Sequence, residues 1–313
     1  MTLEKAAETI VKTCMNLQKG EKALVITDFR LCRIGDIILS EARKITETDM
    51  IEIPVGKENG EEPPEDAAED MKHYDVIIIP TTKSLSHTKA RRDANSAGAR
   101  IATLPGITEE TMERCIDIDY GELKERHEKI KKELIGSKEI RIATELGADV
   151  TTSVINTHGD TGMLHKKGDF GNLPTGEVDS GVKEGETNGK IIVDASFGGI
   201  GKLENPIIIN VEKGYAVRIE GGEEAERLKE KLDSFGKEAY KIAELGIGTN
   251  PKAIITGNIL EDEKALGTVH FALGNDVTYG GKNNVQIHLD GIITKPTIYI
   301  DGKKIMDKGE LLI

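Results

Sequence analysis

The stretch Lys22-Ala-Leu-Val-Ile-Thr27 decides the fold of the first part of the chain, together with the helical pattern at residues 34–45 and Met50-Ile-Glu-Ile-Pro54. A short apolar run predicts a buried strand, and a helix between two such runs predicts a βαβ unit. Asp75-Val-Ile-Ile-Ile79 and Arg100-Ile-Ala-Thr103, with a helical pattern at residues 86–97 between them, repeat the unit. We therefore expect an α/β domain whose parallel sheet is covered by helices on both faces.

From about residue 138 the sequence changes its character, because glycine becomes frequent and the apolar runs pair as hairpins. Pro206-Ile-Ile-Ile-Asn-Val211 and Tyr215-Ala-Val-Arg-Ile219 flank Gly214, and Asp301-Gly302 interrupts the run from Thr297 to Met306. Such turns predict antiparallel pairs. We expect a Rossmann-like domain at residues 1–136 and an α+β, mainly antiparallel domain at residues 137–313, connected by a charged helix at residues 119–134. No GxGxxG motif follows the first strand, so nothing points to a dinucleotide.

The composition restricts the partners of this 313-residue chain. It has 55 acidic and 42 basic residues and a formal charge of −13, which argues against nucleic acid as a partner. No apolar run approaches the length of a membrane span, and the charged N-terminus has no apolar signal segment. The widely spaced Cys14, Cys32 and Cys115 form no CxxC pair and are expected to be free thiols. We expect a cytoplasmic protein without a nucleic-acid or membrane partner.

A candidate metal site lies in the second domain. Asn284-Val-Gln-Ile-His-Leu-Asp-Gly291 is typical of a strand, in which His288 and Asp290 point to the same face. His270 lies in a second apolar run, Gly267-Thr-Val-His-Phe-Ala-Leu-Gly274. A histidine in an apolar strand is, by itself, more often a hydrogen-bonded core residue. Two imidazoles and a carboxylate on neighbouring strands, however, form a facial site that suits a divalent transition metal.

Three further stretches offer glutamates: Glu177 in Asn172-Leu-Pro-Thr-Gly-Glu-Val178, Glu244 before Leu-Gly-Ile-Gly-Thr-Asn-Pro251, and Glu263 in Glu261-Asp-Glu-Lys264. In this order, with the two histidine motifs, they resemble the metalloaminopeptidase family that contains aminopeptidases T and S. The segment Ser84-Leu-Ser-His-Thr-Lys-Ala-Arg91 resembles part of that family's first domain. The resemblance therefore covers most of the chain.

The resemblance implies a metal-dependent aminopeptidase that removes N-terminal residues from peptides. It implies a homodimer and two divalent metals per chain, Zn²⁺, Co²⁺ or Mn²⁺, held by Glu177, Glu244, His270, His288 and Asp290. Glu263 is a further ligand by position, and Tyr279 matches the family's tyrosine. In this hypothesis a metal-activated water attacks the peptide carbonyl, Glu177 or Glu263 shuttles the proton, and Tyr279 or one of the metals stabilises the oxyanion.

Two alternatives stay open. Dihydroxypyridine dioxygenases resemble this peptidase family and use a His, His, Asp triad, which implies a single Fe(II) on His270, His288 and Asp290 and a small-molecule substrate. The presence of Glu177 and Glu244 favours the peptidase, because one metal does not need them. The third hypothesis is a non-catalytic metal-binding homologue, since the chain is shorter than those peptidases. His158 and His165 flank a glycine-rich loop before Glu177, and a structural role is the expected one for both.

Overall fold

The computed structural model describes residues 1–313, which form two compact units. The first contains residues Met1–Tyr120 and Asp160–Thr175, and the second contains Gly121–Gly159 and Gly176–Ile313. This division differs from the expected boundary at residue 136. Helix α6 (Tyr120–Leu134) is not a solvated connector, because Ile130 and Leu134 are buried in the core of the second unit. No helix in the structure has both the length and the apolar composition that a bilayer span requires.

The first unit contains a parallel sheet with the strand order β2-β1-β3-β4-β8. Its strands are β1 (Ala23–Asp28), β2 (Thr48–Ile53), β3 (Val76–Ile79), β4 (Arg100–Thr103) and β8 (Phe170–Asn172). Its helices are α1 (Leu3–Thr9), which continues as a π-helical turn at Ile10–Cys14, α2 (Cys32–Arg43), α3 (Glu65–Asp70), the 3₁₀ turn Met71–His73, α4 (Lys89–Ala97) and α5 (Glu109–Cys115). The expected parallel α/β fold is confirmed. Strand β8 was not expected, because its three residues, Phe-Gly-Asn, carry no apolar run.

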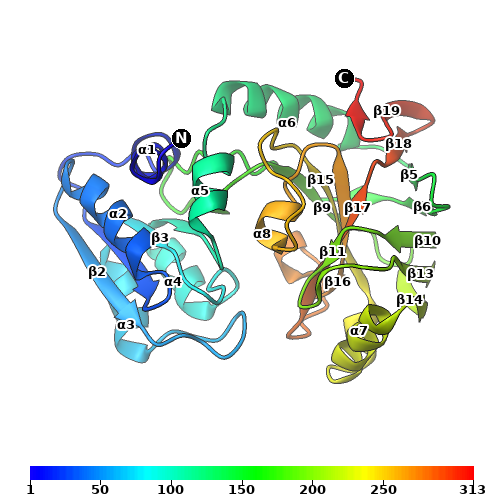
Figure 1. Ribbon diagram of the computed structural model, residues 1–313, viewed down its shortest axis with the longest axis horizontal. Helices are drawn as coiled ribbons and strands as arrows, with labels where there is room; N and C mark the ends of the chain where they lie inside the picture. Colours follow the sequence, from blue (N-terminus) through cyan, green and yellow to red (C-terminus); the bar gives the residue numbers. More distant parts are fainter. The chain divides into compact units, whose positions relative to one another are not determined.

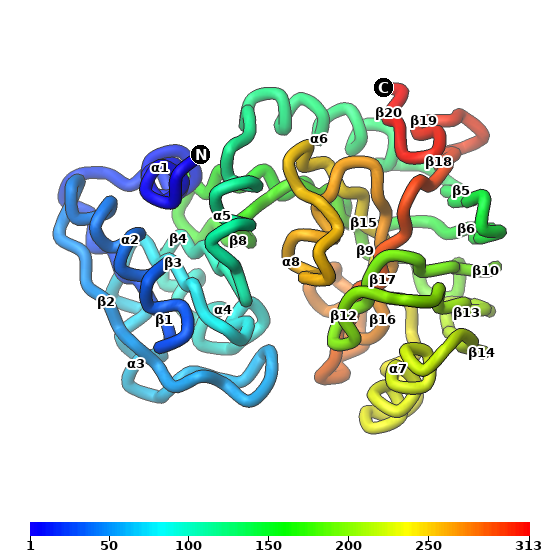
Figure 2. The backbone as a smooth tube through the Cα atoms, viewed as in Figure 1, coloured from blue at the N-terminus to red at the C-terminus, as the bar shows by residue number.

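The second unit contains two antiparallel sheets. The eight-stranded sheet has the order β14-β13-β10-β6-β5-β18-β19-β20, and the seven-stranded sheet has the order β12-β11-β17-β16-β15-β9-β7. Both expected hairpins are present, and Asp301 and Gly302 both adopt the positive φ that a two-residue hairpin turn requires. The last of these strands lead to the C-terminus (Figure 2).

The strands of the eight-stranded sheet are β5 (Ile140–Ala143), β6 (Asp149–Thr152), β10 (Asn188–Val193), β13 (Ile207–Glu212), β14 (Tyr215–Glu220), β18 (Thr297–Ile300), β19 (Lys303–Asp307) and β20 (Glu310–Leu311). Those of the seven-stranded sheet are β7 (Val154–Ile155), β9 (Glu177–Val182), β11 (Ser196–Phe197), β12 (Gly201–Lys202), β15 (Ile242–Gly248), β16 (Thr268–Gly274) and β17 (His288–Thr294). The helical elements are α6, α7 (Glu223–Asp233), which packs beside β13 and β14 (Figure 1), α8 (Ile259–Asp262) and the 3₁₀ turns Lys237–Tyr240 and Val277–Tyr279.

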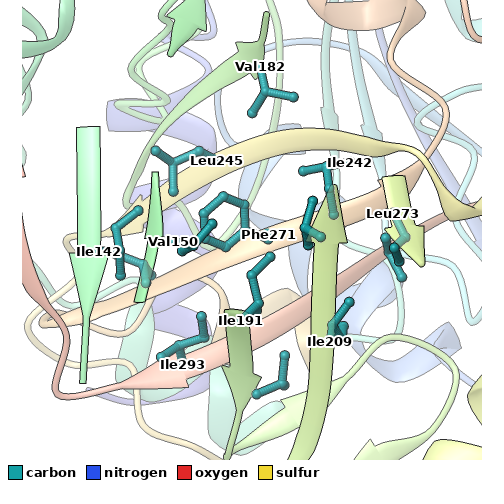
Figure 3. Packing of buried hydrophobic residues seen from close by; sticks show 14 of the residues in the cluster. Ile142, Val150, Val182, Ile191, Ile209, Ile242, Leu245, Phe271, Leu273 and Ile293 are labelled. Atoms are coloured by element: carbon teal, nitrogen blue, oxygen red, sulfur yellow. The ribbon is translucent and has the colours of Figure 1, made fainter. Parts of the chain in front are cut away.

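The core of the second unit lies between its two sheets. Ile142, Ile191 and Ile209 from one sheet meet Leu245, Phe271 and Ile293 from the other, and all of them are buried (Figure 3). Because strand residues alternate between faces, directing Phe271 into this core directs its neighbours His270 and Ala272 to the opposite face. The apolar pattern of β16 thus determines which face of the sheet receives its histidine.

Candidate metal centre

The face of the seven-stranded sheet that points away from the core gathers the predicted site residues. Strands β9, β15, β16 and β17 are neighbours in the sheet (Figure 1). Alternation along each strand places on this face Glu177 and Asp179 from β9, Glu244 and Gly246 from β15, His270 and Ala272 from β16, and His288 and Asp290 from β17. Four strands, of which β9 is distant from the others in the sequence, therefore contribute to one polar surface.

Gly246 provides the space in which the ring of His270 lies. The two residues are directly opposite each other on β15 and β16. A Cβ atom added at Gly246 would be 2.0 Å from Nε2 of His270, although real Cβ atoms essentially never approach another atom within 3.0 Å. A glycine is thus required at this position for steric reasons.

The hydrogen bonds of His288 define which of its nitrogens faces the site. Nδ1 is 2.8 Å from the backbone oxygen of Asn275, which can only accept, so Nδ1 carries the hydrogen. Nε2 is 2.9 Å from Oε2 of Glu244 and 3.5 Å from Oδ1 of Asp290. In the neutral imidazole this nitrogen is also an acceptor, so three acceptors face one another. Such an arrangement is stable only when a cation, either a proton or a metal ion, lies among them.

His270 faces the same group of acceptors. Its Nε2 is 3.3 Å from Oε1 of Glu244 and 3.5 Å from Oε2 of Glu177, while its Nδ1 is buried without a hydrogen-bond partner. The two oxygens of Glu244 therefore point to the two histidines, one each. Two sets of donor atoms result, each within 4.8 Å: Glu177, Glu244 and His270 in one set, and Glu244, His288 and Asp290 in the other.

The electrostatics of the site favour positive charge. Burial by itself would lower the pKa of His270, but the hydrogen bond and the charge of Glu244 outweigh it and raise that pKa to about 10. Burial would also lower the pKa of His288. The charges and hydrogen bonds of Asp290 and Glu244 outweigh burial and raise that pKa well above its usual range. Burial would raise the pKa of Glu244, but hydrogen bonds from both histidines hold it below its usual range. Imidazoles and carboxylates without a thiolate suit a divalent metal ion at this position.

Glu263, expected as a further ligand, lies in neither donor set, and its carboxylate accepts a hydrogen bond from Lys264. Lys264 is not predictable as a site residue from the sequence, because lysine side chains are mostly exposed. Here it is fully buried, and its Nζ is also 3.0 Å from Oε1 of Glu177. Burial raises the pKa of both Glu177 and Glu263, and the charge of Lys264 opposes that rise. The only signal in the sequence was its position next to a candidate ligand.

The ring of Tyr279 lies near two histidine rings. Its ring centroid is 6.3 Å from that of His288, with 29° between the planes, and 6.3 Å from that of His158, with 32° between the planes. Burial raises the pKa of Tyr279 well above its usual range, so the phenol keeps its proton. Tyr279 is thus close to the ring of a candidate ligand and to that of His158.

His158 has a carboxylate partner that the sequence analysis missed. Its Nδ1 is 3.8 Å from Oδ2 of Asp179, and the proximity of this carboxylate raises the pKa of His158. The available signal was the two-residue spacing of Asp179 from Glu177, which puts both on one strand face. His165, by contrast, bonds the backbone oxygen of Thr13 within the first unit.

The fold and the donor set define a two-unit α/β protein with a site for a divalent metal on an antiparallel sheet. The sequence model described as NicX, 2,5-dihydroxypyridine 5,6-dioxygenase, matches residues 36–313. The chain belongs to this family.

The relatives agree with this assignment. A 2,5-dihydroxypyridine 5,6-dioxygenase of Pseudomonas putida is 27% identical over 169 residues, which are 48% of this chain and 47% of that protein. The match thus spans about half the length of this curated relative. The solved structure of 2,5-dihydroxypyridine dioxygenase from Pseudomonas putida KT2440 has a TM-score of 0.87 and 19% identity, covering 99% of this chain and 96% of the other. AmpT from Thermus thermophilus has a TM-score of 0.75 and 17% identity, covering 99% of both chains. At these identities the two structures show the fold alone.

The expectation of an aminopeptidase, and of a hydrolase in general, is wrong. The family match and the relative named above favour the dioxygenase alternative, although the peptidase family has the same fold. The error has a physical cause. The presence of Glu177 and Glu244 does not decide between the two activities, because each also has a role within the protein: Glu177 accepts a hydrogen bond from a buried lysine, and Glu244 lies against both histidines.

Proposed function

We propose that this protein is a dioxygenase that uses one Fe(II) ion to open the ring of a dihydroxypyridine. The observation that carries the proposal is the family match over residues 36–313, which includes every donor described above. The name of the matching relative describes dioxygen chemistry at C5 and C6 of 2,5-dihydroxypyridine. A hydroxylated pyridine is accordingly the substrate class that we assign to this chain.

His270, His288 and Asp290 would hold the metal in this proposal. Two imidazoles and one carboxylate that leave coordination positions open are typical of non-haem Fe(II) oxygenases. Bound there, Fe(II) would supply the redox chemistry that allows dioxygen to react with the ring. The backbone oxygen of Asn275 keeps Nε2 of His288 available as a ligand, and Glu244 keeps both rings turned towards the same point.

The rings near His288 support the proposal of a flat aromatic substrate. The faces of Tyr279 and His158 offer stacking surfaces beside His288, and an aromatic contact of this kind contributes about 0.5–1.5 kcal/mol beyond the buried area. His158, whose pKa is raised by Asp179, is suited to exchange a proton with a ring hydroxyl through the imidazole nitrogen that Asp179 leaves available. In this proposal Tyr279 and His158 stack against the substrate ring, and His158 exchanges a proton with its hydroxyl group.

The test is oxygen uptake by the reconstituted protein. Protein freed of metal is loaded with Fe(II) under anaerobic conditions and mixed with air-saturated buffer containing 2,5-dihydroxypyridine. We expect one dioxygen consumed per ring, measured with an oxygen electrode, and a matching loss of the aromatic absorbance. Other dihydroxypyridine isomers and catechol define the substrate class, and His288→Ala treated identically is the control. Protein with a full complement of Fe(II) that consumes no oxygen with any of these rings would refute the proposal in favour of a non-catalytic metal-binding role.

A further inference from the structure

Lys264 is a fully buried cation whose backbone is held in place. It follows directly after α8 and its C-cap residue Glu263. The backbone nitrogen of Asn250 donates to the oxygen of Lys264 at 2.8 Å, and Asn250 itself is fully buried. An ammonium group in such surroundings is tolerated only when it is paired and hydrogen-bonded. Its carboxylate partners here are Glu177 and Glu263.

The two donor sets, taken without Lys264, have the composition of a two-metal site. They share Glu244, whose two oxygens face His270 and His288, and a shared carboxylate is what a pair of metals needs. In one set, however, Oε1 of Glu177 is already bonded by the ammonium group. The carboxylate of Glu263 also accepts a hydrogen bond from the ammonium group of Lys264. One oxygen of each carboxylate that a second metal would require is therefore already bonded by a cation that belongs to the protein.

The charges lead to the same result. Glu177, Glu244, Glu263 and Asp290 carry one negative charge each when ionised. The ammonium group and one dication neutralise all but one of these charges. A second dication would add two further positive charges next to a fixed ammonium group in a buried, weakly screened environment.

We propose that Lys264 takes the place of a second metal ion and thereby limits this chain to one divalent metal. It is a positioning residue, because it contacts Glu177 and Glu263 and acts on the metal site through them. The inference rests on the proposed metal centre and concerns how many ions it accepts. It also explains how a chain with the carboxylates of a two-metal site supports the chemistry of a single metal.

The experiment counts metal ions. The full-length protein and its variants are freed of metal, titrated with Co²⁺ while the visible absorption is recorded, desalted, and analysed for cobalt per chain by mass spectrometry. We expect one Co²⁺ in the wild type and two in Lys264→Met, where Glu177 and Glu263 become available as ligands. The double variant Lys264→Met with Glu263→Gln returns to one ion, because a carboxylate of the second site is missing. Lys252→Met, which removes an exposed lysine of the same unit, is the matched control and keeps one ion.

Thermal unfolding and far-UV circular dichroism establish that each variant is folded. If Lys264→Met does not fold, Lys264→Gln, which keeps a hydrogen-bond donor and loses the charge, is measured instead. Two ions in the wild type, or one ion in a folded Lys264→Met or Lys264→Gln protein, would overturn the inference and leave the proposed function untouched. A wild type that binds no Co²⁺ and no Fe(II) would overturn both.

Discussion

Gly246→Ala tests the arrangement of the site with a single methyl group. The new Cβ would be 2.0 Å from Nε2 of His270, so the imidazole has to retreat by about 1 Å or more. Gly246 does not have the positive φ that only glycine tolerates easily, so the backbone accepts alanine and the perturbation is confined to the contact. Overpacking of this size costs about 1–3 kcal/mol of stability. A 1 Å displacement of a metal-site residue reduces activity on the order of 100-fold.

The assay compares Gly246→Ala with Gly56→Ala, whose new Cβ would meet only ordinary contacts of 3.4 Å and whose backbone is equally permissive. For each variant we measure the free energy of unfolding in urea, the affinity for Co²⁺, and the rate of oxygen uptake with Fe(II). We expect a weakened metal site in Gly246→Ala and wild-type behaviour in Gly56→Ala. Unchanged metal affinity and oxygen uptake in folded Gly246→Ala would show that His270 does not need its present position, and the assignment of this histidine to the site would be withdrawn.

Three further predictions separate the site from the fold. Asp290→Ala removes a metal donor beside His288, so we expect loss of bound metal in cobalt analysis with a nearly unchanged circular dichroism spectrum; unfolding of the protein would indicate a structural metal instead. His127 is buried with its pKa lowered to about 3 by burial, below its unfolded value near 6.5, so its neutral form stabilises the fold above pH 6.5 and this stabilisation is lost as the pH falls. Between pH 7 and pH 5 the wild type should therefore lose about 2 kcal/mol more unfolding free energy than His127→Phe, measured by urea titration, and equal losses would contradict the assignment. Phe271→Ala empties part of the core from the strand that carries His270, so we expect about 3–5 kcal/mol of lost stability in the same titration while the folded fraction still binds Co²⁺; a loss under 1 kcal/mol would argue against the packing of the two sheets.

The local part of the fold is readable from the sequence. Apolar runs bounded by turn residues predicted four of the five parallel strands and both hairpins, because burial of a strand requires such runs and tight turns require particular residues. The fifth parallel strand, Phe170–Asn172, carries no such pattern. This strand forms because its backbone pairs with the edge of β4, whose residues lie about 70 positions earlier in the sequence.

The candidate donors were also accessible to sequence reasoning, since His288 and Asp290 share a face of β17 by alternation alone. The role of the residues around these donors was not accessible from the sequence. Lys264 has the composition of a surface residue, and only the folded chain removes it from water and sets it between Glu177 and Glu263. Without that contact, the glutamates of the site indicated a second metal and a hydrolase.

By itself, the sequence determined the elements and the kind of atoms that the site offers, because alternation, turn chemistry and ligand type are local properties. Only the tertiary structure decided which charges are already neutralised before any metal arrives. Burial and pairing are properties of the whole chain: the same lysine is an ordinary solvated charge in the unfolded state and a fixed counter-ion in the folded one. The proposed restriction of the site to one metal follows from that difference.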